Sequence, residues 1–108
     1  MPFVHITAIN KEDEAQKCII LTHINEQHQI TERGWFGYAK VGNKKYPFIL
    51  QPCSNRLGKM ELLYDDDTRY PTNILTKQII IGEYFTVFDP PDEGRNEYLY
   101  QITNIYEY

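Results

Sequence analysis

The sequence predicts a mainly β fold: a single small barrel or sandwich of seven or eight short strands, with at most one short helix. Aromatic residues make up 14% of the chain, and such residues suit the half-buried surfaces of a sheet. Short runs of alternating apolar and polar residues recur, with turn-forming residues between them. The length of 108 residues fits one domain, residues 1–108, with one hydrophobic core.

The N-terminal part predicts two strands joined by a turn or a short helix. Phe3 to Ile9 alternates with the strand period. Asn10 and the acids after it suit the start of a helix, so Lys11 to Lys17 predicts one or two helical turns. The β-branched run from Cys18 to Ile24 predicts a second strand, although the spacing also allows a helix that continues to His23.

The middle of the chain predicts a β-hairpin. The polar segment from Asn25 to Gly34 forms a loop, and strands follow at Trp35 to Val41 and at Lys44 to Gln51. Glycine followed by asparagine, at positions 42 and 43, predicts a type II′ turn between them. Pro47 cannot donate a backbone hydrogen bond, so the second strand is expected at an edge or with a bulge.

The last part predicts three strands separated by turns rich in aspartate, proline and glycine. Arg69 and Tyr70 begin a short return strand that Pro71 ends, and Asn73 to Lys77 is irregular or one helical turn. Gly82 predicts a bulge or bend, which suits a small SH3-like or OB-like barrel. The three strands are Lys59 to Tyr64, Ile79 to Phe88 and Glu97 to Tyr106.

The tyrosines near the C-terminus share one strand parity. Because alternate residues of a strand face the same side, they are expected to form one face, either in the core or at an exposed edge. The residues are Tyr98, Tyr100, Tyr106 and Tyr108, together with Ile102.

Charge is distributed unevenly along the chain. The net charge is -4, yet residues 33–59 contain six basic residues and no acid. Residues 60–108 contain ten acids and three basic residues. No signal peptide and no apolar run of about 20 residues is visible, so we expect a cytoplasmic protein that has no membrane contact. Cys18 and Cys53 are then expected to be free thiols.

The basic segment is also rich in aromatic residues, which makes the hairpin the candidate binding face. Alternation predicts that Phe36, Tyr38 and Lys40 face outward with Lys45, while Trp35 and Val41 pack inward with Phe48 and Leu50. A purely structural interpretation is that the aromatics are core and the lysines protect an edge strand from aggregation. The candidate binding residues are Phe36, Tyr38, Lys40, Lys44, Lys45 and Tyr46.

Three functions are consistent with this pattern. The first is a non-catalytic binding or regulatory module that contacts a protein partner, or a second copy of itself, through the edge of the 35–51 hairpin. The second is single-stranded nucleic-acid binding, with aromatics stacking on bases and lysines contacting phosphates. The third is an acidic inhibitor or immunity-type protein that uses the negative C-terminal half to block a basic surface.

Motifs for catalysis or metal binding are not found. Asp65 to Asp67 lacks the spacing of a calcium loop and predicts an aspartate-rich turn. The histidines and cysteines do not frame a zinc site. Cys53 lies near Arg56, but no base is placed beside it. The sequence therefore predicts no metal, no cofactor and no enzymatic activity.

Overall fold

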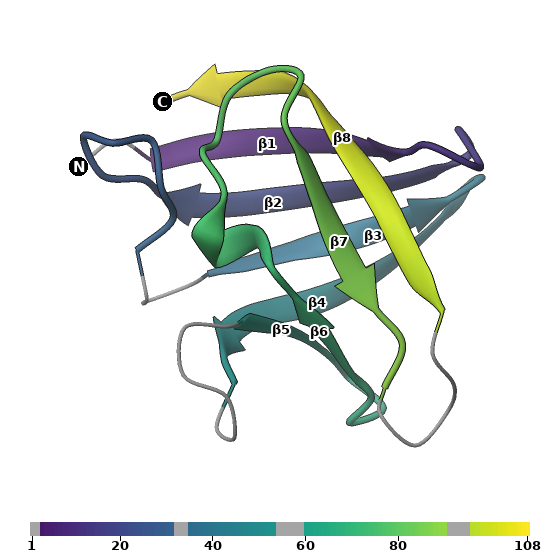
Figure 1. Ribbon diagram of the computed structural model, residues 1–108. Helices are drawn as coiled ribbons and strands as arrows, with labels where there is room; N and C mark the ends of the chain where they lie inside the picture. Colours follow the sequence, from purple (N-terminus) through teal and green to yellow (C-terminus); the bar gives the residue numbers. More distant parts are fainter. Residues whose placement is uncertain (1–2, 32–34, 54–59, 91–95) are drawn as a thin grey trace.

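The protein is a closed antiparallel barrel in which eight strands pair in chain order, with β8 returning to β1 (Figure 1). The computed structural model describes residues 3–31, 35–53, 60–90 and 96–108. The predicted mainly β barrel is therefore confirmed. Pairing in chain order makes it an up-and-down barrel, whereas the OB-fold is a five-stranded Greek-key barrel. The strands are β1 Phe3–Asn10, β2 Gln16–His23, β3 Phe36–Val41, β4 Lys44–Pro52, β5 Met60–Tyr64, β6 Arg69–Thr72, β7 Tyr84–Phe88 and β8 Glu97–Glu107.

The seams of the barrel differ in length. The β1–β8 seam spans seven register pairs and includes a bulge between Thr7 and Ala8. The β6–β7 seam contains one register pair, Thr72 with Val87. A hydrogen bond of 2.7 Å from the Thr72 hydroxyl to the Thr86 carbonyl supports this short seam.

Isoleucines close one end of the barrel. Ile24 and Ile30 lie in the β2–β3 connection, and Ile74 and Ile79 lie in the β6–β7 connection. All four are at most 4% exposed. The 3-10 helix η1, Ile74–Thr76, is the helical turn predicted here and lies at this end of the barrel (Figure 1). Burial of these side chains removes apolar surface from water and stabilises the two connections across this end. Together the four isoleucines form a plug that closes this end of the barrel.

Two turns form as their sequences predict. Gly42 has a φ of +62° and Asn43 does not have a positive φ, as a type II′ turn requires. The aspartate turn between β5 and β6 has Asp67 at a φ of +66°. The Asp67 amide donates to the Tyr64 carbonyl at 3.1 Å, and the Asp66 carboxylate accepts from the Thr68 amide at 3.0 Å. This is a three-residue hairpin loop with a left-handed third residue.

The predicted helix at Lys11 to Lys17 is wrong. These residues form the β1–β2 turn and the start of β2, and Asn10 accepts a hydrogen bond from the Glu12 amide at 2.9 Å. Asparagine caps a turn here by the same side-chain chemistry that caps a helix. Pairing of β2 along β1 then outweighs the weak local preference for a helix.

Two strand boundaries also differ from the prediction. Ile79 belongs to the plug and Gly82, with a φ of +97°, forms a turn, so β7 begins only at Tyr84. Pro71 does not end β6 but pairs with Glu61 of β5. Proline is tolerated here because β7 pairs with β6 only at Thr72, so no strand requires a backbone N–H from Pro71. The predicted loop end at Gly34, the strand start at Lys59 and most of the loops at 52–58 and 89–96 lie outside the described residues.

Candidate functional site

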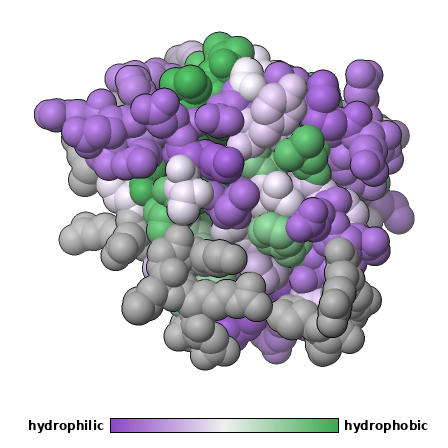
Figure 2. Space-filling model, viewed as in Figure 1, coloured by the Kyte–Doolittle hydropathy of each residue, from purple (hydrophilic) through white to green (hydrophobic). Residues whose placement is uncertain are grey.

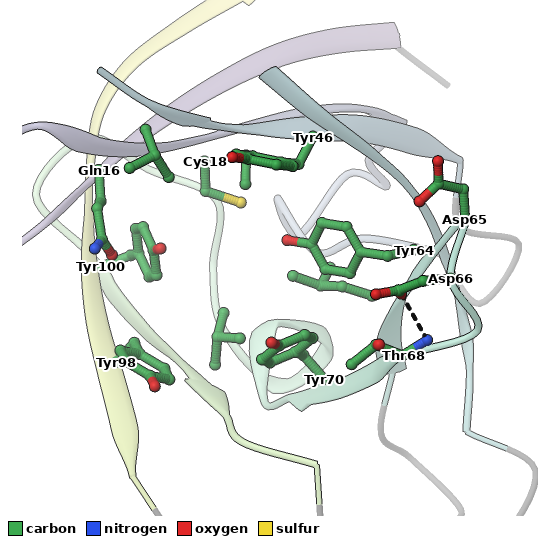
Figure 3. Close-up of a pocket in the computed structure, with 14 residues that line it drawn as sticks. Gln16, Cys18, Tyr46, Tyr64, Asp65, Asp66, Thr68, Tyr70, Tyr98 and Tyr100 are labelled. Carbon is green, nitrogen blue, oxygen red and sulfur yellow. Dashed lines mark hydrogen bonds between the residues drawn. The ribbon is translucent and has the colours of Figure 1, made fainter. Parts of the chain in front are cut away.

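A cavity of about 350 Å³ opens at the end of the barrel opposite the isoleucine plug. Gln16 at the start of β2, Val41 at the end of β3 and the Asp65–Thr68 turn contribute to its rim. Side chains point into it from several strands (Figure 3). Eight-stranded barrels are just wide enough to be filled by side chains or to hold one small ligand. Five lining residues are tyrosines: Tyr46, Tyr64, Tyr70, Tyr98 and Tyr100.

The space exists because small side chains meet in register on one wall. Ala8, Cys18 and Ala39 lie opposite one another on β1, β2 and β3. Tyr46 continues this row on β4 but is 45% exposed, so it stands at the rim. Cys18 and Ala39, which line the cavity, leave the volume that leucine or isoleucine fills deeper in the barrel, for example at Leu50, whereas Ala8 is fully buried and does not line it.

Aromatic rings form the opposite wall. Tyr64 packs edge-on against Phe48 at 5.6 Å and against Tyr70 at 5.4 Å, measured between ring centroids. Tyr100 stacks on Phe85 at 5.7 Å. Such contacts fix the ring orientations and contribute about 0.5–1.5 kcal/mol each beyond burial. The wall is therefore a rigid, preformed surface.

Burial holds the Cys18 thiol and the hydroxyls of Tyr64 and Tyr100 in their neutral forms. Burial raises the pKa of the Tyr64 hydroxyl and of the Tyr100 hydroxyl above their ordinary range. Burial also raises the pKa of the Cys18 thiol to about 12. A neutral buried thiol is a weak nucleophile, whereas neutral hydroxyls both donate and accept hydrogen bonds.

Carboxylates surround the mouth. Asp65 and Asp66 line the cavity, and hydrogen bonds from Thr68 hold the pKa of Asp66 below its ordinary value. Asp89 hydrogen-bonds to Tyr98, which raises the pKa of that tyrosine. Asp13 is close enough to raise the pKa of Tyr100 further. Acids from three connections thus act on tyrosines of the lining.

The six predicted binding residues fall on two faces of the hairpin. Phe36, Tyr38, Lys40 and Lys45 share the outer face, as predicted. Lys44 and Tyr46 have the other parity, because they pair with Val41 and Ala39 on the cavity side. Phe36 is 48% exposed, and the Lys45 ammonium lies 5.1 Å above the Tyr38 ring.

The predicted inward packing is wrong for Trp35, whereas Val41 faces the cavity side as predicted but is not buried. Phe48 and Leu50 are buried as expected, but Trp35 and Val41 are 42% and 43% exposed. Trp35 precedes β3 and packs outside the barrel against Phe3 and His23, so strand alternation does not govern it. Val41 lies at the open mouth of the cavity.

A row of three lysines crosses the outer face of the same strands. Lys17 of β2 is opposite Lys40 of β3, and Lys40 is opposite Lys45 of β4. Like charges directly opposite one another destabilise a sheet. Within the described residues the single ion pair is Arg69 with Glu61, at 3.1 Å, so no carboxylate offsets this row there. Lys17 was not among the predicted binding residues because it is distant in sequence.

The free edge of the 35–51 hairpin, which the sequence analysis predicts as a binding edge, is short. β3 is paired with β2 and β4 along its whole length. β4 pairs with β5 from Phe48 to Pro52, so Lys44 to Pro47 has no register partner on that side among the described residues. Pro47 lies in this free segment, in agreement with the edge position that proline predicts.

Other surfaces offer less. On the face shown in Figure 2, hydrophobic side chains form small separate patches among hydrophilic ones. Within the described ranges there is no group of three or more histidine, cysteine, aspartate or glutamate side chains that could hold a metal ion. Over the same part of the chain, no helix has the length and apolar character needed to cross a bilayer.

Comparison with protein-family models, with curated proteins and with solved structures found no significant match. Function must therefore be argued from the geometry of the chain itself. The strongest feature, the cavity, was missed by sequence reasoning because its residues come from seven strands and from the β5–β6 turn. The one available signal was the tyrosine-rich composition, nine tyrosines in 108 residues.

Proposed function

We propose that the protein binds a small molecule in the tyrosine-lined cavity at the open end of the barrel. One observation carries this proposal: the barrel is plugged at one end and hollow at the other, with a cavity of about 350 Å³. That volume falls within the usual range of ligand pockets, about 300–1,000 Å³. A fold that only needed stability would fill this space with larger side chains.

The chemistry of the lining favours binding rather than catalysis. No histidine lines the cavity among the described residues, and Cys18 is a neutral buried thiol. Proton transfer near neutral pH needs a group that titrates there, and neither this thiol nor the buried tyrosines do. Tyrosines instead provide apolar area together with hydrogen-bonding hydroxyls, a combination that suits ligand recognition.

A fragment titration followed by amide NMR tests the proposal. Binding in the cavity is expected to shift resonances of Cys18, Ala39, Tyr64 and Tyr100 while leaving Trp35 unchanged, because Trp35 lies outside the barrel. The Ala39→Leu variant should lose this binding, since leucine would extend from the wall into the space of the cavity. Phe36→Ala, on the outer face of the same strand, is the matched control and should bind normally.

The proposal fails if no fragment shifts the cavity resonances, or if Ala39→Leu binds as well as the unmodified protein. Shifts confined to the outer hairpin would also overturn it and would favour the second candidate below.

A second candidate function is single-stranded nucleic-acid binding on the outer face of β2, β3 and β4. The lysine row of Lys17, Lys40 and Lys45 favours it, because three like charges in register cost stability and would suit a row of phosphates. Phe36 lies four residues from Lys40 on the same face of β3 and is half exposed, so a base could stack on it.

Titration of Trp35 fluorescence with mixed-sequence single-stranded DNA and RNA tests this candidate. Trp35 neighbours Phe36, with ring centroids 6.2 Å apart, so quenching would be local. Binding should weaken as salt rises, and Lys40→Glu should abolish it. Absence of quenching at low salt, with the protein folded, would remove this candidate.

A further inference from the structure

The charge around the cavity is one-sided. Among the described residues, every charged side chain that lines it is an acid: Asp65 and Asp66. Asp89 is close enough to the lining residue Tyr98 to raise the pKa of its hydroxyl, and Asp13 of the β1–β2 turn raises the pKa of Tyr100. Lys44, at the tip of the β3–β4 hairpin, has the cavity-side parity but does not line the cavity. An anionic ligand would therefore meet repulsion from carboxylates, and none of the described lining residues is a cation that would offset it.

The uncharged part of the lining suits a positive charge as well. A cation is attracted to the face of an aromatic ring within about 6 Å of its centroid, and groups of aromatic rings are a known means of binding ammonium ligands. Tyr64, Tyr70 and Tyr98 point toward the space from different strands (Figure 3). Their hydroxyls can also accept hydrogen bonds from an N–H donor.

Asp66 is the carboxylate best placed to pair with such a ligand. Its side chain reaches toward Tyr64 (Figure 3), and its charge is close enough to act on the Tyr64 hydroxyl. One of its oxygens, Oδ1, accepts the hydrogen bond from the Thr68 amide at 3.0 Å. Together with the side-chain hydrogen bond from Thr68, which lowers the pKa of Asp66, this bond orients the carboxylate and keeps it charged.

Apolar groups complete the lining. Ala39, Leu62 and Val87 line the cavity between the tyrosines. They provide contact area for the hydrocarbon body of a ligand and no hydrogen bonds. A ligand that satisfies both kinds of lining has an apolar body and a positively charged head.

We infer that the ligand of this cavity is an organic cation, a protonated amine with an aromatic or aliphatic body, whose head lies among the tyrosines beside Asp66. This inference rests on the proposed function, because it names the chemical class of the molecule that the cavity takes. Carboxylates, phosphates and fatty acids are excluded by the same charges.

Three probes that share a phenyl body and differ in the charge of the head test the inference. These are 2-phenylethylamine, 2-phenylethanol and 3-phenylpropionate, titrated at pH 7 and followed by amide NMR at the cavity residues. We expect the amine to bind about tenfold more tightly than the alcohol, and the carboxylate not to bind. The affinity of the amine should fall as salt rises, because screening weakens charge interactions.

Two variants of the aspartate turn sharpen the test. Asp66→Asn keeps an oxygen for the Thr68 amide and removes the charge, so the amine should bind about three- to tenfold more weakly while the alcohol is unaffected. Asp67→Asn is the matched control: it removes a charge from the same turn at a residue that does not line the cavity, and asparagine tolerates its left-handed backbone. This control should change amine binding much less than Asp66→Asn.

The possible results separate the inference from the proposed function. If the alcohol or the carboxylate binds at the cavity as tightly as the amine, the inference is wrong and small-molecule binding stands. Equal losses in Asp66→Asn and Asp67→Asn would also overturn it, because the effect would then be general electrostatics. If none of the three probes shifts a cavity resonance, both the inference and the proposed function fail.

Discussion

Replacing Ala39 by leucine tests directly whether the open end of the barrel is hollow. Leucine adds three carbons to alanine, and a fully buried methylene contributes about 0.8 kcal/mol. Full burial in the cavity would thus stabilise the fold by about 2 kcal/mol. Because the cavity opens to solvent, we expect the free energy of unfolding to rise by about 0–1 kcal/mol.

Ala8→Leu is the matched control for this substitution. Ala8 lies in the same row of small residues but is 0% exposed and does not line the cavity. Overpacking of a filled core costs about 1–3 kcal/mol. The two variants should therefore differ by about 2 kcal/mol, which corresponds to a difference in Tm of about 8 °C for a domain of this size. β-Propensity does not account for the difference, because both substitutions exchange alanine for leucine within a strand.

Urea unfolding followed by circular dichroism measures both free energies. If Ala39→Leu is destabilised as much as Ala8→Leu, the space beside Ala39 is already filled in solution. The proposed binding site would then not exist.

Three further predictions concern single residues. Gly37→Ala should lower the free energy of unfolding by about 1–3 kcal/mol in urea, because its Cβ would clash with the Ile19 carbonyl and approach the Phe48 ring to 3.0 Å. Asp67→Gly should be at least as stable as the unmodified protein and about 1 kcal/mol more stable than Asp67→Ala, since Asp67 has a φ of +66°. The Cys18 thiol ionises above about 9.0 when unfolded but only near 12 when folded, so its contribution to stability is present at pH 7 and declines from pH 9 toward pH 12. Cys18→Ala should accordingly lose less stability between pH 7 and pH 10, and an equal loss in both proteins would contradict this.

The fold was predictable because its signals are local. The alternation of apolar and polar residues predicted β1 and β3, and Gly42 predicted the turn that places β4 beside β3. The errors arose where a tertiary contact overrides a local preference. The segment at Ile79 has strong strand propensity, but its side chain closes the end of the barrel instead of joining a ladder.

The prediction that the C-terminal tyrosines share one face fails because β8 contains a bulge. Tyr98 and Tyr100 face the cavity, as do alternate residues of a regular strand. At the bulge, β8 shifts register, so that Thr7 pairs with Asn104 and Ala8 with Ile102. Beyond it the parity is reversed, and Tyr108 packs outside the barrel against Phe3 at 5.5 Å. The prediction of one common face is therefore wrong, and nothing in the sequence around Thr103 marks the bulge.

The candidate site was less predictable than the fold because a cavity forms where side chains from several strands are too small to fill the interior. The hairpin gave a visible pattern of lysines and aromatics, whereas the space beside Ala39 depends on small residues that meet across strands. Register between β2 and β3 brings Cys18 opposite Ala39, and these two residues are far apart in sequence. Pattern analysis of one strand at a time does not reveal such a pair.

The two candidate functions can be separated by two adjacent residues. Ala39 lines the cavity, and Lys40 points to the outer face between Lys17 and Lys45. Ala39→Leu should abolish fragment binding and leave any nucleic-acid titration unchanged, whereas Lys40→Glu should do the reverse. Lys40→Glu also converts two repulsive cross-strand pairs into attractive ones, so it should raise the free energy of unfolding by about 1 kcal/mol.

A gain in stability on removing a residue indicates that the residue is not there for the fold. If Lys40→Glu is more stable and loses nucleic-acid binding, the lysine row serves that ligand at the expense of the sheet. A stability gain without any change in binding would leave the lysines with the edge-protecting role alone. If instead Lys40→Glu is less stable, the lysines contribute to packing through their methylene stems. The main reason to propose a ligand on the outer face would then no longer hold.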